Sequence, residues 1–121
     1  MTTRFADLAF HPAHAREVVR GVLAGVPPQV VEKAQVMVSE LVTNAIVHGS
    51  GEASIVVEVD EESLHVEVLD CEPTLDLAPL RVGASSQRGR GLAIVDALAS
   101  SWGVEPRLAG KAVWFNLDLR G

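Results

Sequence analysis

The sequence predicts an α+β fold, a two-layer sandwich in which helices cover one face of a mixed, mostly antiparallel sheet. Three observations support this prediction: an amphipathic helical pattern over residues 28–48, a hairpin pattern over residues 55–68, and an order of helices and strands that is not a strict β-α-β alternation. The 121 residues can bury one hydrophobic core, and no linker, internal repeat or low-complexity tract divides them. We therefore expect a single domain over residues 1–121.

The first half of the chain is expected to contain an edge strand and two helices. Residues 5–10 alternate enough to form the strand, and Pro12 suits the first turn of a helix that Gly25 would end. The second helix covers residues 28–48 and is stopped by the glycines that follow from Gly49.

The second half is expected to supply the rest of the sheet. The hydrophobic residues of the hairpin recur at every second position and so share one face: Ile55, Val57, Val59, Leu64, Val66 and Val68. Residues 72–88 are aperiodic and contain proline, which indicates a long loop and a candidate lid. A helix opened by residues 89–91 is expected to end at Trp102 and Gly103. Strands near residues 104–108 and 112–119 would then complete the sheet.

Charge and cysteine content argue against several classes of function. The net charge is −6 and the pI is near 5.1, whereas binding to nucleic acid or to an anionic membrane needs a basic surface. Cys71 is the single cysteine, so neither an intramolecular disulfide nor a cysteine-rich metal site can form. No apolar segment approaches the length that spans a bilayer. We expect a soluble, cytoplasmic protein.

The first candidate site lies in the helix of residues 28–48. Glu40, Asn44 and His48 are spaced four apart, so they fall within about 80° of one another around the helix axis. An apolar set occupies the adjoining face: Ala34, Val38, Leu41 and Ala45. The polar stripe would then lie at the edge of the core, where a ligand can be partly desolvated. The alternative is an ordinary solvated helix face.

The second candidate is Asp70. Counting by twos from Leu64 places Asp70 on the buried face of its strand, at the carboxyl end, where alternation predicts an apolar residue. A carboxylate there needs a partner, such as the amino group of a ligand. The alternative is an aspartate that turns outward or caps the next turn. Cys71 is interpreted as a small apolar residue, because no neighbouring base suggests an activated thiolate.

The third candidate is the sequence Gly89-Arg90-Gly91 before a helical pattern. Two glycines there allow a ligand to approach the backbone closely, and the N–H groups of a first helical turn attract phosphate. Glycines before a helix also form simple tight turns. The stretch is neither a Rossmann fingerprint nor a P-loop, because it lacks the third glycine and the Gly-Lys-Ser/Thr end of those motifs.

Taken in order, these motifs resemble the ATP-binding domain shared by gyrase, the heat-shock chaperone, histidine kinases and the MutL mismatch-repair proteins, the GHKL or Bergerat fold. The matching stretches are SELVTNAIVHG at 39–49, VLDCEP at 68–73, GRGLAIVDALASSWGV at 89–104 and GKAVWFNL at 110–117. The amino-acid sequences of the first and third stretches are most similar to those of bacterial anti-sigma-factor serine/threonine kinases, the stand-alone ATP-binding regulators of actinobacteria.

The resemblance implies a role for each matching residue. Asn44 would coordinate a Mg²⁺ ion that bridges the ATP phosphates, Glu40 would be the general base toward an acceptor serine, and Asp70 would accept a hydrogen bond from the adenine amino group. Gly89 and Gly91 would let the backbone meet the phosphates. The remaining candidates for nucleotide binding are Arg88, Arg90, Leu92 and His48, the last with a supporting or helix-capping role as its alternative.

Three classes of function follow from the resemblance. The leading one is a kinase that binds a sigma factor and phosphorylates a STAS-type anti-sigma antagonist, with ATP and Mg²⁺ as cofactors and a homodimer as a possible assembly. A nucleotide-dependent interaction module without kinase activity is the alternative. A histidine kinase is disfavoured, because 121 residues leave no dimerisation helices or phosphoacceptor segment. One departure is that Cys71, Glu72 and Pro73 stand where relatives often carry glycines after the aspartate.

Overall fold

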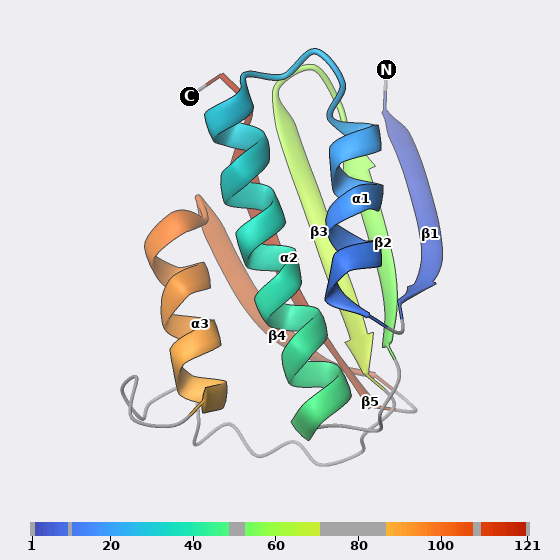
Figure 1. Ribbon diagram of the computed structural model, residues 1–121, viewed down its shortest axis with the longest axis vertical. Coiled ribbons are helices and arrows are strands. Elements are labelled where there is room, and N and C mark those ends of the chain that lie inside the picture. The colour runs from blue at the N-terminus through green and yellow to red at the C-terminus, as the bar shows by residue number, and fades with distance from the viewer. Residues whose placement is uncertain (1, 10, 49–52, 71–86, 108–109, 121) are drawn as a thin grey trace.

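The computed structural model of the chain describes residues 2–9, 11–48, 53–70, 87–107 and 110–120 (Figure 1). Within them the elements are β1 (Thr3–Ala9), α1 (Pro12–Val22), α2 (Pro28–His48), β2 (Ala53–Val59), β3 (Ser63–Asp70), α3 (Gln87–Leu98), β4 (Ser101–Arg107) and β5 (Gly110–Asp118). The predicted bounds of α2 are confirmed, and so is the hairpin of β2 and β3.

The strands form one sheet in the order β1-β2-β3-β5-β4, and each pairing is antiparallel. The three helices lie on the same side of this sheet, with α2 between α1 and α3 (Figure 1). The predicted α+β sandwich is therefore confirmed, with an antiparallel sheet.

The core fills the space between the helices and the covered face of the sheet. The hydrophobic positions predicted for the hairpin face it, and Ile55, Val57, Leu64 and Val66 are fully buried. The apolar set of α2 (Ala34, Val38, Leu41, Ala45) is buried as expected. Phe115 of β5 is the largest fully buried side chain among the described residues. The apolar stripes of sheet and helix therefore lie as their periodicities predict.

The predicted ends of α1 and α3 are wrong. Helix α1 ends at Val22, and Gly25 lies in the following turn with a φ of 87°. Helix α3 begins at Gln87, so Gly89 and Gly91 lie inside it, and it ends at Leu98.

Trp102 and Gly103 therefore belong to β4 and do not end the helix. The indole Nε1 of Trp102 donates to Asp96 Oδ1 at 2.8 Å, which ties β4 back to α3. A Cβ on Gly103 would lie 2.8 Å from Cζ2 of Trp114, its neighbour on β5. The glycine thus makes room for the indole of Trp114, as glycines in strands often do where a neighbour approaches closely.

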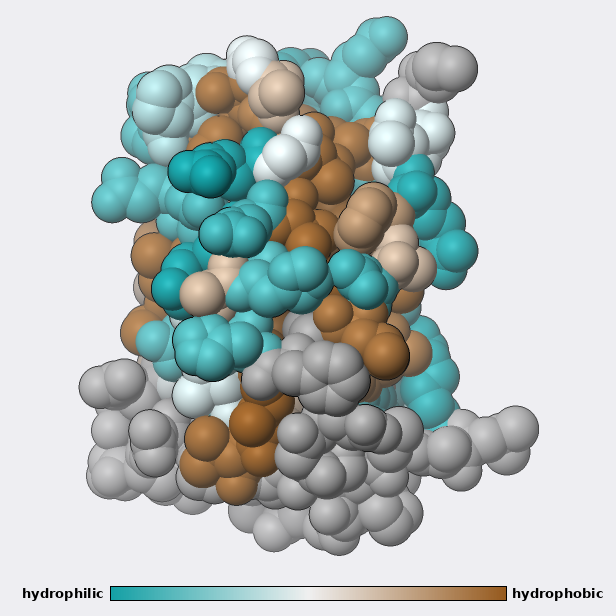
Figure 2. Space-filling model, turned by 45° about the vertical axis from the view of Figure 1, so that its right-hand side comes forward, coloured by the Kyte–Doolittle hydropathy of each residue, from teal (hydrophilic) through white to brown (hydrophobic). Residues whose placement is uncertain are grey.

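The exposed surface combines charged and hydrophobic side chains (Figure 2). Large hydrophobic residues exposed on the described part are Phe5, Leu8, Val36 and Val47. Isolated residues of this kind are normal on globular domains. Within the described residues, no helix combines the length and hydropathy that a membrane crossing requires.

Candidate functional site

One end of the sandwich gathers the residues that the sequence singled out. Strand β3 finishes there at Asp70, β5 starts there at Gly110, and the carboxyl half of α2 meets the amino-terminal half of α3 (Figure 1). Segments far apart in the sequence thus bring their polar residues to a common region. The resemblance implies that the three motifs form one site, and the structure brings the elements that carry them to the same end of the sheet.

Helix α2 contributes Glu40 and Asn44. Both side chains are partly exposed, while Leu41 and Ala45 beside them are buried in the core. The predicted polar stripe along the edge of the core is therefore confirmed for these two residues. His48 is the last residue of α2, and its side chain lies outside the described part of the structure.

Helix α3 contributes Gly91, which packs directly against the polar stripe of α2. A Cβ on Gly91 would lie 2.8 Å from Asn44 Nδ2 and 3.2 Å from Glu40 Oε2. The residue is buried, and the side chains of both Glu40 and Asn44 lie against the bare backbone of α3 at this point. The approach of a ligand to this glycine stays a prediction, and in the structure Asn44 and Glu40 lie against it.

The other residues of the third motif differ in what the structure describes. Gly89, Arg88 and Arg90 belong to the first turn of α3, and only their backbone is described. Leu92 is 8% exposed and belongs to the hydrophobic core. It anchors α3 to the sheet and so fixes the position of the preceding Gly91. The loop expected at residues 72–88 lies almost entirely outside the described residues, as do Cys71, Glu72 and Pro73.

Asp70 lies on the covered face of the sheet, as the alternation predicted. It follows Leu64, Val66 and Val68 on that face. Asp70 is 6% exposed and is the polar residue that the structure buries among the residues it describes. Its Oδ2 accepts a hydrogen bond of 3.1 Å from Nζ of Lys111, its cross-strand neighbour on β5. The outward-turning alternative for Asp70 is therefore wrong.

Lys111 was missed by the sequence reasoning. Counting by twos back from Leu117 through Phe115 and Val113 places Lys111 on the covered face of β5, directly beside Asp70 once the two strands pair. The alternation in β5 carries this signal, but only the pairing of β3 with β5 reveals the partner.

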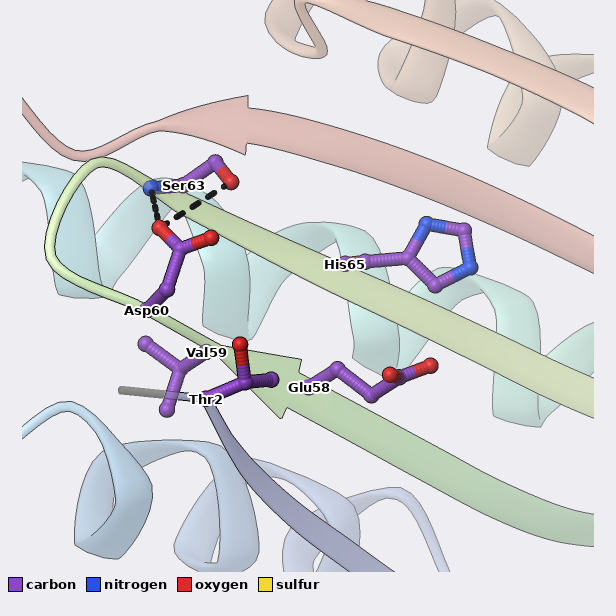
Figure 3. Close-up of a pocket in the computed structure, with 6 residues that line it drawn as sticks. All are labelled: Thr2, Glu58, Val59, Asp60, Ser63 and His65. Carbon is purple, nitrogen blue, oxygen red and sulfur yellow. Dashed lines mark hydrogen bonds between the residues drawn. The ribbon is translucent and has the colours of Figure 1, made fainter.

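A separate shallow depression lies at the β2–β3 turn, at the other end of β3 (Figure 3). Its volume is about 290 Å³, and its lining consists of Thr2, Glu58, Val59, Asp60, Ser63 and His65. Asp60 Oδ1 accepts from the backbone N–H groups of Glu62 and Ser63 at 2.8 Å each. These two hydrogen bonds lower the pKa of Asp60 below its ordinary value, and the bond from Glu62 contributes most. Asp60 thus serves to hold the turn.

This depression is remote from the site at the opposite end of the sheet. Seven residue steps separate Ser63 from Asp70, which corresponds to about 23 Å along the strand. None of the residues that line the depression belongs to the candidate site between α2, α3 and the end of β3.

The described residues of the site group few potential metal ligands. Among the described residues, no group of three or more His, Cys, Asp or Glu side chains is placed to hold a metal ion. Asn44 and Glu40 offer oxygen atoms, and Mg²⁺ commonly takes one or two protein oxygens and completes its shell with phosphates and water.

The first prediction concerns Gly91→Ala. The added methyl would collide with the end of the Asn44 side chain, which can rotate away, so the helix should form and the amide should be displaced. Because alanine also favours helix by up to about 1 kcal/mol, we expect thermal stability to change little. Affinity for MgATP should fall by about 10- to 150-fold, the value of a hydrogen bond or ligand to a charged group.

Gly21→Ala in α1 is the matched control, since a Cβ there would meet no atom within 4 Å. Calorimetric titration of both variants with MgATP separates a local effect from a general effect of alanine. Equal affinities in the two variants would contradict a site between Asn44 and Gly91.

Comparison with known families agrees with this geometry. A family model of the histidine kinase-like ATPase domain matches residues 5–117, which is nearly the whole chain and includes the residues of the site. No curated protein sequence matches the chain.

Proposed function

The chain belongs to the histidine kinase-like ATPase domain family, and from this membership and the site geometry we propose that it is an ATP-dependent protein serine/threonine kinase. Its substrate in this proposal is a STAS-type anti-sigma antagonist, and its other partner is a sigma factor. The packing of Glu40 and Asn44 against Gly91 carries the proposal, because it combines a carboxylate, an amide and a helix backbone without a side chain in one place.

The residues present fit ATP with Mg²⁺. Oδ1 of Asn44 is an oxygen ligand of the kind that Mg²⁺ prefers, and the first turn of α3 offers backbone N–H groups to phosphate. A bound Mg²⁺ would neutralise charge on the phosphates. The buried carboxylate of Asp70, on the sheet face that the helices cover, would accept a hydrogen bond from the adenine amino group.

Glu40 is proposed as the general base. It lies one helical turn before Asn44, about 6 Å along the axis, so a phosphate held near Asn44 is within reach of a hydroxyl held near Glu40. The carboxylate would take the proton of the acceptor serine as the new O–P bond forms and the bond between the γ-phosphorus and ADP breaks. Phosphoryl transfer depends mainly on positioning and charge neutralisation, so these few groups suffice.

The second prediction concerns Asn44→Ala. The variant should lose the part of nucleotide affinity that depends on Mg²⁺, because the alanine removes the protein ligand of the cation while leaving the adenine pocket intact. Calorimetric titrations with ATP, with and without Mg²⁺, measure this difference for the variant and for the wild type. The assignment fails if Mg²⁺ strengthens ATP binding equally in both.

The kinase activity itself is tested with partner proteins. We expect the wild type, incubated with ATP and Mg²⁺, to phosphorylate a serine or threonine of at least one protein in a panel of STAS-type antagonists, detected by intact-protein mass spectrometry. A wild type that binds ATP and an antagonist but transfers no phosphate would contradict the kinase and favour the nucleotide-dependent interaction module.

A further inference from the structure

Asp70 and Lys111 form a row with Ala53 on the covered face of the sheet. The register pairs Asp70 with Ala53 of β2 on one side and with Lys111 of β5 on the other. Ala53 is 3% exposed, and the side chains of Asp70 and Lys111 are 5% and 15% exposed. A carboxylate and an ammonium are therefore held side by side in a largely desolvated position, at the end of the sheet that carries the site.

Burial of an ion pair needs an explanation beyond stability. Desolvation of the two charges offsets much or all of their attraction, so a buried pair is often no more stabilising than well-packed hydrophobic residues. Strand β5 has hydrophobic residues at the following positions on this face, Val113, Phe115 and Leu117. Another such residue at position 111 would continue the pattern, whereas Lys111 interrupts it beside the proposed base-binding carboxylate.

The pair presents an acceptor next to a donor. The ammonium group has three N–H donors, and the bond to Asp70 Oδ2 at 3.1 Å uses one of them. Adenine presents the complementary pair, because its amino group is a donor and the ring nitrogens on either side of it, N1 and N7, are acceptors.

We propose that Lys111 is a base-reading residue, which donates a hydrogen bond to N1 or N7 of adenine while Asp70 accepts one from the neighbouring amino group. The inference rests on the proposed ATP site. It adds to that proposal that recognition of the base depends on two side chains of adjacent strands, one on β3 and one on β5.

The test compares ATP with analogues that lack a single ring nitrogen. Calorimetric titrations in Mg²⁺ would use ATP, 1-deaza-ATP and 7-deaza-ATP with the wild type, with Lys111→Met and with Lys33→Met. Lys33→Met is the matched control, because Lys33 is the other lysine of the chain and is exposed on α2.

We expect the wild type to bind one of the two deaza analogues about 10- to 150-fold more weakly than ATP, the range for a hydrogen bond to a charged group. In Lys111→Met, ATP should bind about as weakly as that analogue does, and the difference between the two nucleotides should disappear. Lys33→Met should behave as the wild type. Thermal melting of each variant reports whether it is folded.

Two results overturn the inference. If the wild type binds ATP and both analogues equally, Lys111 does not contact the base. This result is obtained with the wild type alone, so it does not depend on whether a variant folds. The inference is also contradicted if folded Lys111→Met still binds the deaza analogue more weakly than ATP, by the same factor as the wild type. In both cases ATP still binds and the proposed function stands, whereas a wild type that binds no ATP removes the two proposals together.

Discussion

Glu40→Ala is expected to lower the rate of phosphoryl transfer to an antagonist serine by about 10²- to 10⁴-fold, the usual contribution of a positioned general base. This corresponds to about 3 to 5 kcal/mol of activation barrier. Affinity for MgATP should change little, because the carboxylate acts on the acceptor hydroxyl and makes no contact that the bound nucleotide requires. Single-turnover phosphorylation and calorimetry measure the two quantities separately.

Glu32→Ala is the matched control for this prediction. Glu32 lies two turns earlier on α2 and is exposed, whereas Glu40 is partly buried against Gly91. The same loss of charge at position 32 should leave both rate and affinity unchanged. Should Glu40→Ala phosphorylate a cognate antagonist as fast as the wild type, Glu40 is not the base. A parallel loss of ATP affinity would instead indicate that Glu40 positions the nucleotide.

The sequence could predict the parts of the site that depend on periodicity within one element. Glu40 and Asn44 share a helix, so their spacing alone places them on one stripe beside Leu41 and Ala45. Asp70 follows from alternation along a single strand. In each case a regular period determines which face a residue occupies, without knowledge of the rest of the fold.

The parts that depend on contacts between elements could not be predicted in the same way. Lys111 becomes the partner of Asp70 only through the register of β3 with β5, two strands separated by α3 and β4. The ends of α3 were misplaced because glycine has a low helix propensity, and propensity alone does not reveal tertiary partners. Gly91 lies inside the helix with its bare backbone against Asn44, and Trp102 lies in β4, with Asp96 of α3 accepting its N–H.

The helix contacts also explain how the motifs of α2 and α3 act together in our proposal. Gly91 lies against both Glu40 and Asn44, so any shift of α3 relative to α2 moves the wall behind the general base and behind the cation ligand at once. Leu92 and Val95 hold α3 in the core at that point. In our proposal the phosphate end of the site is thus set by helix packing, whereas the base end is set by the pairing of two strands.

The last prediction concerns Asp70→Asn, which should weaken MgATP binding by about 5- to 150-fold. An asparagine keeps the shape of the side chain, but its amide nitrogen presents a donor where the adenine amino group and Lys111 also donate. A buried polar group left without a suitable partner costs about 1 to 3 kcal/mol, which is the origin of this range. Discrimination between ATP and GTP should decrease as well, because the acceptor that selects the amino group is compromised.

Loss of folding has to be separated from loss of recognition in this variant, because removing one partner of a buried ion pair can cost about 3 to 5 kcal/mol of stability. Thermal melting gives the folded fraction, and calorimetric affinity is then compared among folded molecules only. Asp118→Asn is the control, since Asp118 pairs with Ser63 at the opposite end of the sheet and is exposed. A folded Asp70→Asn variant that binds ATP as tightly as Asp118→Asn, with equal preference over GTP, would exclude Asp70 from the adenine pocket. Reduced stability with unchanged affinity would instead assign the Asp70–Lys111 pair to the architecture of the sheet.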